Sequence, residues 1–219
     1  MTALDGITYR APVPWFQLPA RIAILLSGRG SNFEALADAC VRGELPARIV
    51  LVLADRADAA GLGKALARGL PARLEERRAG EPRASHEERL AGHLEVAGAD
   101  LVCLAGFMRV LSPAFVTRFE RRIVNVHPSL LPSFPGLEAQ KQALEHGVQV
   151  AGATVHLVDA GTDTGPIAGQ EAVPVLPGDD AQRLAARILS AEHDLYPSTV
   201  GRLLAGGWTV AGRRLVFPR

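Results

Sequence analysis

The sequence predicts an α/β fold, a Rossmann-like open twisted sheet that is mostly parallel in its N-terminal half and has helices on both faces. Over the first half of the chain, short apolar runs rich in β-branched residues alternate with amphipathic stretches, as in right-handed strand–helix–strand units. In the second half strand-like runs follow one another more directly, so we expect antiparallel strands to be added there. With 219 residues, of which 48% are hydrophobic, the chain is long enough for one sizeable core.

Strands are predicted where a short apolar run breaks into glycine, proline or polar residues. In the first half these segments are 21–26, 48–54, the more charged 71–75, and 100–105. In the second half they are 123–127, 151–158 and 167–175, followed by a terminal hairpin in 208–217 around the turn 210–213. The first twenty residues hold three prolines and no periodicity, so we expect a loosely attached arm that Trp15 and Phe16 dock.

Helices are predicted between these strands from apolar residues at helical spacing. They cover 33–42, 59–68, 86–97, 112–119 and 138–146, and a long helix follows Asp179. Ser31 and Asp179 each precede a Glu or Gln by three residues, the spacing of a capping box, which marks a helix start. Ser112 before Pro113 fits a cap followed by the first helical position. Pro197 is expected to break or kink the last helix near its middle.

Composition excludes several classes of function. The net charge of +1 gives no basic excess of the kind that a nucleic-acid-binding surface needs. No apolar stretch reaches the roughly 20 residues that span a bilayer, and the N-terminal segment lacks the pattern of a signal peptide. The two cysteines form no disulfide framework, and the histidines show no metal-ligand spacing. We therefore expect a cytoplasmic protein without a bound metal and without a nucleic-acid or membrane partner.

The segment SGRGSN at 27–32 joins a predicted strand to a predicted helix. Its glycines permit a tight turn, and the helix N-terminus offers unpaired N–H groups with partial positive charge, a combination that binds phosphate. The segment has no Gly-Lys-Ser/Thr ending and no third glycine of G-x-G-x-x-G, which favours a phosphate monoester over a dinucleotide. A plain capped turn without a ligand explains the same residues equally well at this stage.

Two further stretches follow predicted strands. Residues 106–113, GFMRVLSP, put apolar side chains and Arg109 where a flat heterocycle would fit, although a solvated connection is the simpler interpretation of this stretch alone. Residues 159–166, DAGTDTGP, place two acids in a glycine-bearing loop. This loop lacks the ligand number and spacing of a calcium site, and acidic turns are usually solvated.

Asn125 and His127 stand two residues apart on the apolar strand 123–127, so their side chains face the same side of the predicted sheet. In open α/β sheets ligands gather at the carboxyl ends of strands, and three prolines follow His127 within eight residues. For an isolated pair, a capping Asn and a hydrogen-bonded core His are the favoured interpretation. A carboxylate of the loop 159–166 near His127 would favour the imidazolium and fix its orientation.

The sequence resembles the glycinamide ribonucleotide formyltransferase family of purine synthesis in five segments that occur in the family's order. They are SGRGSN (27–32), LAGFMRVLSPAF (104–115), NVHPSLLPSFPG (125–136), the loop 159–166 and AEHDLYP (191–197). The match of NVHPSLLPSFPG together with AGFMRVLSP is highly specific, whereas GRGSN alone is not. The resemblance spans most of residues 21–206, and the first twenty residues lie outside it.

This resemblance implies transfer of the formyl group of 10-formyltetrahydrofolate to the primary amine of glycinamide ribonucleotide. The products would be N-formylglycinamide ribonucleotide and tetrahydrofolate, made in de novo purine biosynthesis by a monomer or homodimer whose partners are these small molecules. One formyltransferase domain would cover 21–219 after an N-terminal arm of residues 1–20. Within it, 21–105 would bind the phosphate and nucleotide, 106–206 would bind folate and carry catalysis, and 207–219 would form the terminal hairpin.

The resemblance also assigns individual residues. The catalytic residues would be Asn125, His127 and Asp163. The nucleotide would be bound by Gly30, Ser31 and Asn32 at its phosphate and by Glu192 at its ribose end. The folate would be bound by His86, Met108, Arg109, Val110, Leu111 and Asn125, with the loop before Asp163. Two positions depart from the family: His86 stands where many members have an Arg that touches the folate, and the family's D-G-G-P is D-T-G-P at 163–166, which we expect to stiffen the loop.

The residue types agree with this chemistry. Amine attack on a formyl carbon creates a tetrahedral oxyanion and a cationic nitrogen. Asn125 can donate a hydrogen bond to the oxyanion, and an imidazolium at His127 can donate and also stabilise charge if Asp163 raises its pKa. Because the substrate brings its own amine, no activated Ser or Cys is needed.

Three alternatives share part of this pattern. A formyltetrahydrofolate hydrolase would use water as the acceptor, but it typically carries a regulatory domain ahead of the first strand, which twenty residues cannot hold. A methionyl-tRNA formyltransferase would need a C-terminal tRNA-binding domain and a basic surface, and we expect neither here. A non-enzymatic nucleotide- or folate-binding module would require the strand-end Asn and His and the loop Asp to be coincidental. A folate-turnover assay without the nucleotide distinguishes the hydrolase from the transferase.

Overall fold

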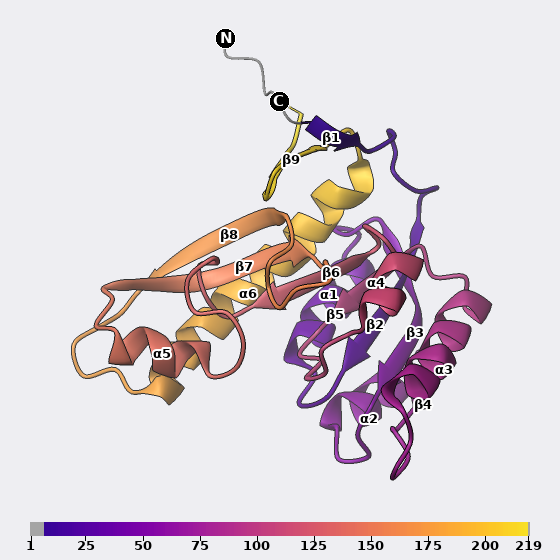
Figure 1. Ribbon diagram of the computed structural model, residues 1–219, viewed down its shortest axis with the longest axis horizontal. Helices are drawn as coiled ribbons and strands as arrows, with labels where there is room; N and C mark the ends of the chain where they lie inside the picture. Colours follow the sequence, from indigo (N-terminus) through magenta and orange to yellow (C-terminus); the bar gives the residue numbers. More distant parts are fainter. Residues whose placement is uncertain (1–6, 219) are drawn as a thin grey trace. The chain divides into compact units, whose positions relative to one another are not determined.

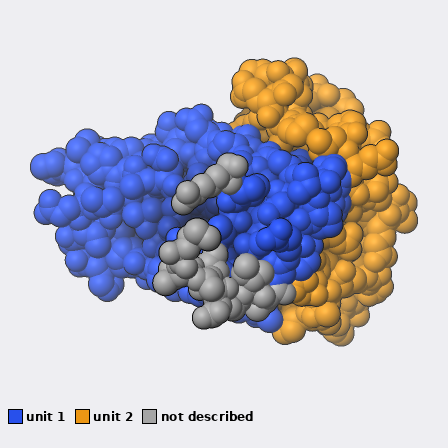
Figure 2. All heavy atoms as spheres, turned by 90° about the horizontal axis from the view of Figure 1, so that it is seen from above, with its two compact units in different colours: residues 1–16, 126–219 blue, residues 17–125 orange. Residues whose placement is uncertain are grey.

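The structure is a computed structural model that describes residues 7–218 (Figure 1). The chain divides into two compact units, which Figure 2 shows in different colours. One, here called the first unit, consists of residues 17–125, and the other, the second unit, consists of residues 1–16 and 126–219. Among the described residues, no helix is both long enough and apolar enough to cross a membrane.

The first unit is a parallel sheet with the strand order β6-β5-β2-β3-β4. Its strands are β2 (Ala20–Leu26), β3 (Ala47–Ala54), β4 (Ala72–Leu74), β5 (Leu101–Leu104) and the first residues of β6 (Ile123–His127). Its helices are α1 (Ser31–Val41), α2 (Ala60–Ala67), α3 (Arg83–Val96) and α4 (Pro113–Arg118). Right-handed crossovers place α1 and α2 on one face and α3 and α4 on the other, where the last two touch. The predicted parallel half is confirmed.

The second unit is built mainly from antiparallel pairs, as expected for the C-terminal half. Its strands are β1 (Ile7–Arg10), β7 (Val150–Leu157), β8 (Ile167–Pro174), β9 (Thr209–Ala211) and β10 (Arg214–Val216). Antiparallel pairs join β1 to β9, β9 to β10 and β7 to β8, whereas β8 and β10 run parallel. Helix α6 (Ala181–Ala205) packs on β7 and β8, and α5 (Ala139–Glu145) packs on α6. Small and branched apolar residues fill the core between them: Ala143, Ala151, Ala153, Val173, Leu184 and Ile188.

The prediction of a loosely attached arm is wrong for residues 7–10, which form β1 and pair with β9. A four-residue edge strand is too short to give a periodic signal, so pairing with β9 decides its conformation. Residues 1–6 of the predicted arm lie outside the described part. Trp15 docks as expected, because its ring lies edge-on to Trp208 with the centroids 4.7 Å apart.

In both predicted capping boxes the predicted cap residue is wrong by one position. Gly30, with φ 75° and no side-chain bond, occupies the cap position of α1, and Ser31 is the first helical residue. At α6 the side chain of Asp180, not Asp179, accepts the Arg183 N–H. Asp179 instead accepts the Leu176 N–H before the helix. In each case two adjacent residues are suitable caps, and the spacing alone does not choose between them.

Helix α6 runs without a break through Pro197, so of the two predicted effects of this proline the break is wrong and the kink stays a prediction. A proline inside a helix removes one backbone bond and costs roughly 3 kcal/mol. Tyr196 and Val200, on either side of it, are fully buried. Burial of each such side chain is worth roughly 1.5–3 kcal/mol, so packing offsets the cost of the proline.

Candidate functional site

The loop at 27–32 has the geometry of an anion-binding turn. It leads from β2 into α1, whose first residues present backbone N–H groups with the positive end of the helix dipole. A Cβ at Gly30 would lie 2.6 Å from the Cα of Gly61, so only glycine allows this close approach. The Gly61 N–H also donates to the carbonyl of Gly28 at 3.0 Å, which fixes the loop against the start of α2.

The stretch 106–112 after β5 is fastened to this loop. The Ser27 hydroxyl accepts the Met108 N–H at 2.8 Å, and the Ser27 N–H donates to the carbonyl of Gly106 at 3.1 Å. Met108 and Val110 are exposed apolar side chains, whereas Leu111 is buried. The structure therefore brings two predicted binding segments, 30–32 and 108–111, onto one edge of the first unit, at the carboxyl ends of its parallel strands.

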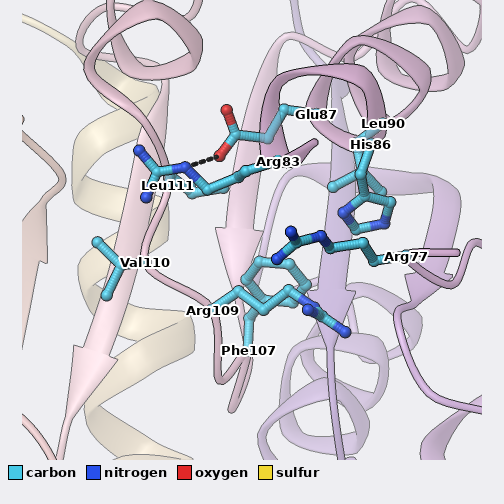
Figure 3. A pocket seen from close by; sticks show the side chains of 9 residues that line it. All are labelled: Arg77, Arg83, His86, Glu87, Leu90, Phe107, Arg109, Val110 and Leu111. Carbon is cyan, nitrogen blue, oxygen red and sulfur yellow. Dashed lines mark ion pairs between the residues drawn. The ribbon is translucent and has the colours of Figure 1, made fainter. Parts of the chain in front are cut away.

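A cavity of about 250 Å³ lies beside this stretch in the first unit (Figure 3). It is lined by Arg77, Arg83, His86, Glu87, Leu90, Phe107, Arg109, Val110 and Leu111. Four of these residues are predicted folate contacts, and Phe107 adds an aromatic wall. Three arginines face one glutamate, so the lining is suited to a ligand that is partly apolar and carries negative charge.

His86 and Arg83 share α3 but have different surroundings. His86 is 1% exposed, and its Nε2 lies 2.8 Å from the carbonyl oxygen of Glu75, a bond in which the ring nitrogen donates. Arg83, one turn earlier, is half-exposed and keeps its guanidinium 3.6 Å from the Glu87 carboxylate at the cavity. Sequence reasoning missed Arg83 and Arg77. Arg83 lies before the predicted helix 86–97 but is the first residue of α3, so the three-residue spacing that puts it on one face with His86 is recognisable only once the helix start is known.

In the second unit, His127 and Asp163 lie close together at the end of β6. The His127 Nδ1 is 3.4 Å from Oδ2 of Asp163, and both side chains are largely buried. The His127 Nε2 lies 2.9 Å from the carbonyl of Phe134, so this nitrogen carries the hydrogen that is donated. Nδ1 can then donate toward Asp163 only when the ring is an imidazolium.

A second histidine faces the same carboxylate. His156, on β7, is 2% exposed and places Nε2 3.5 Å from Oδ1 of Asp163. Its Nδ1 lies 2.9 Å from the carbonyl of Leu157, which directs the other ring nitrogen at the acid. Sequence reasoning missed His156 because its partner stands seven residues later, across the turn between β7 and β8, and no short motif joins them.

The backbone around Asp163 is strongly constrained. Asp163 has φ 54°, in the left-handed region, and its carboxylate accepts the Gly136 N–H at 2.8 Å. The Thr164 hydroxyl donates to Asp159 at 2.6 Å, a bond consistent with the expected stiffening by this threonine. A Cβ at Gly165 would lie 1.9 Å from the carbonyl oxygen of Leu157, so the next position must be glycine. These contacts hold the carboxylate in place.

Burial and the neighbouring charges act on the pKa values of His127 and Asp163 in opposite directions. Burial lowers the pKa of His127, and although the Phe134 carbonyl and the Asp163 charge act to raise it, the net pKa lies below the usual histidine value. Burial acts to raise the pKa of Asp163, but the His156 hydrogen bond, the Gly136 N–H and the two imidazoles outweigh it, and its pKa is lowered. The Asp163 charge therefore acts on the pKa of His127 in the expected direction, but burial outweighs it.

The other two predicted residues lie in different places. Asn125 is on β6 two residues before His127, so the strand period puts both side chains on one face. Glu192 is on α6 and is buried. Its proposed role in binding the ribose end of the nucleotide stays a prediction.

Comparison with known proteins gives one consistent result. A family model described as "Formyl transferase" matches residues 20–200. A "Phosphoribosylglycinamide formyltransferase" of Mycobacterium tuberculosis (strain ATCC 25618 / H37Rv) is 45% identical over 209 residues, which is 92% of this chain and 93% of that protein. The crystal structure of "glycinamide ribonucleotide transformylase 1" from Symbiobacterium toebii superposes on this chain with a TM-score of 0.89 and 48% sequence identity. The match covers 91% of this chain and 94% of the Symbiobacterium chain.

A longer relative matches as well. The "Trifunctional purine biosynthetic protein adenosine-3" of Drosophila pseudoobscura pseudoobscura is 47% identical over 189 residues, 85% of this chain. The chain spans 14% of the length of that relative.

Proposed function

We propose, because this chain belongs to the formyl transferase family, that it transfers the formyl group of 10-formyltetrahydrofolate to the amine of glycinamide ribonucleotide. The products are N-formylglycinamide ribonucleotide and tetrahydrofolate, and the reaction serves purine biosynthesis. The observation that carries this proposal is the buried His127–Asp163 pair at the end of β6, with Asn125 on the same face of that strand. Such a group suits the charge changes of acyl transfer to an amine better than it suits simple binding.

In this mechanism the amine attacks the formyl carbon and the carbonyl oxygen becomes an oxyanion. Asn125 donates its side-chain N–H to that oxygen. The His127 ring has Nε2 bonded to Phe134, and its net pKa lies below the usual value, so at neutral pH Nδ1 is free of hydrogen and can accept the proton that the attacking amine loses. The imidazolium so formed, with Nδ1 3.4 Å from Asp163, then donates this proton to the oxyanion or to the leaving nitrogen.

Asp163 supplies the negative charge that stabilises the cations formed during the step. Its lowered pKa makes it a carboxylate at neutral pH, so it stabilises both the imidazolium and the cationic nitrogen of the tetrahedral intermediate. When the intermediate collapses, the bond from the formyl carbon to N10 of the folate breaks, and N10 receives a proton. The nitrogen that attacked loses one proton, so the amide and tetrahydrofolate are both neutral at these atoms.

The two substrates are assigned to the residues as follows. The nucleotide phosphate binds at the N-terminus of α1 through Gly30, Ser31 and Asn32, and Glu192 binds the ribose end. The pteridine and benzoyl parts of the folate bind at 108–111 with Asn125. The acidic tail binds in the arginine-rich cavity, where Arg83 takes the contact first assigned to His86, because the His86 ring is committed to Glu75. Residues 21–105 and 106–206 keep their proposed roles in nucleotide and folate binding.

One assay tests this function against hydrolysis. Protein is mixed with 10-formyltetrahydrofolate, with and without glycinamide ribonucleotide, and tetrahydrofolate formation is followed by absorbance. We expect turnover that requires the nucleotide. Equal turnover without it would identify a hydrolase, and no turnover in either mixture would reject the enzyme proposal. The His127→Ala variant serves as the control for contaminating activity, since loss of a positioned proton donor costs about 10²–10⁴ in rate.

A further inference from the structure

Asp55 is a buried acid that the proposed reaction does not use. It directly follows β3, and its side chain is 2% exposed. One carboxylate oxygen, Oδ2, accepts a hydrogen bond from Nε of Arg109. The other oxygen, Oδ1, is buried and has no hydrogen-bond partner among residues 7–218. An acid that is both buried and half-satisfied is costly for the fold, so its presence needs an explanation.

The position of Asp55 in the fold suggests that it binds a ribose hydroxyl, but its contacts exclude that role. In dinucleotide-binding folds, the acid at the end of the second strand of the β–α–β unit binds a ribose hydroxyl. Asp55 stands at that place, after β2, the glycine-bearing loop, α1 and β3. Its carboxylate is closed to solvent and paired with Arg109, so it is not open to a ribose.

Arg109 is the residue through which Asp55 can act. Its side chain is partly exposed and lines the arginine-rich cavity. Within the described part of the chain, Asp55 is the side chain to which Arg109 is bonded, and the bond uses Nε. The two terminal nitrogens of the guanidinium remain for a ligand. A long flexible arginine that is held at Nε has its planar fork oriented before the ligand arrives.

We propose that Asp55 is a positioning residue that orients Arg109 to bind a carboxylate of the folate's glutamate tail. This inference rests on the proposed function, which places a folate in that cavity. The fork of an arginine matches a carboxylate in a bidentate arrangement, and Arg77 and Arg83 make the lining net positive around it (Figure 3). Asp55 itself is not among the residues that line the cavity, so it would act through Arg109.

Binding measurements test this without the second substrate. Titration calorimetry with tetrahydrofolate, and with its dimethyl ester whose tail is uncharged, is carried out on wild type, Asp55→Ala, Arg109→Ala and the double variant. We expect Asp55→Ala to raise the Kd of tetrahydrofolate about ten- to a hundredfold, as for a lost charge-assisted hydrogen bond, and to leave the Kd of the ester unchanged. In the Arg109→Ala background, Asp55→Ala should have no further effect, because the two act as one unit.

Two further variants separate positioning from stability. Asp55→Asn keeps an oxygen that can accept the Arg109 Nε–H and should recover part of the affinity; it also replaces Asp55→Ala in the cycle if that variant does not fold. Asp100→Asn is the matched control, because it weakens another Arg–Asp pair of the first unit, that with Arg21, at the amino ends of the strands. It should leave both Kd values unchanged.

The outcomes are distinct. Additive losses in the double variant, or equal losses for the acid and its ester, would show that Asp55 only supports the fold and would overturn the inference. Wild-type protein that does not bind tetrahydrofolate would overturn the proposed function itself.

Discussion

Replacing Asp163 by asparagine separates the charge of this residue from its part in the loop. The amide oxygen of Asn can still accept the Gly136 N–H, now 2.8 Å from the carboxylate, so the loop keeps its anchor. The loss is a negative charge 3.4 Å from Nδ1 of His127. At that distance Coulomb's law gives about 1.2 kcal/mol for an effective dielectric constant of ~80 and about 5 kcal/mol for ~20. Since about 1.4 kcal/mol is a factor of ten in rate, kcat should fall by between about tenfold and a few thousandfold.

The assay is kcat at saturation with both substrates, measured across neutral pH. The pKa of Asp163 is held below its usual value, so the carboxylate is ionised throughout this range. Because its charge acts to raise the pKa of His127, Asp163→Asn should also move the acid limb of the pH–rate profile to lower pH. Asp159→Asn is the matched control, because it neutralises the other acid of this loop, which is bonded to Thr164. If kcat of Asp163→Asn equals that of the control, the charge does not act on the transition state and the reasoning is refuted.

Three other changes probe the site. Burial lowers the pKa of His127 in the folded protein, so its contribution to stability is present above the unfolded value of about 6.5 and is lost as pH falls through the folded value. In urea titrations, as pH falls below about 6.5, the free energy of unfolding of wild type should therefore decrease more steeply than that of His127→Gln. Parallel curves would contradict this. Joint replacement Ser31→Ala and Asn32→Ala should raise KM for the nucleotide about tenfold and leave KM for the folate unchanged, and equal changes in both would argue against a phosphate site. Gly30→Ala combines φ 75° with a Cβ 2.6 Å from Gly61 Cα, so calorimetry should show a loss of roughly 2 kcal/mol or more, whereas an unchanged Tm would mean that the loop adapts.

Local sequence signals predict much of the framework. The alternation of apolar runs and amphipathic stretches in the first half gives the parallel strands, because each β–α–β unit is closed by contacts within about 30 residues. Ser112 does cap α4, accepting the Phe115 N–H with Pro113 as the first helical residue. The signals fail where two adjacent residues compete, as at Gly30 and Ser31, or where an element is decided by a distant partner, as β1 is by β9.

The candidate site is predictable only in part, for a related reason. Residues that stand in one short segment, such as Asn125 and His127, are recognisable from the strand period. The contacts of His156 with Asp163 and of Asp55 with Arg109 join segments that are far apart or carry no motif. Nor does residue type reveal that His127 is buried deeply enough for its pKa to fall despite a nearby carboxylate. These features depend on tertiary packing, which a linear pattern does not encode.

The destination of the formyl carbon tests the central claim most directly. A single turnover is run with 10-formyltetrahydrofolate that carries ¹³C in the formyl group, together with glycinamide ribonucleotide, and the products are analysed by NMR and mass spectrometry. The account predicts that the label appears as the formamide carbon of the nucleotide product, in step with tetrahydrofolate release. Label recovered as free formate, with the nucleotide unchanged, would contradict it.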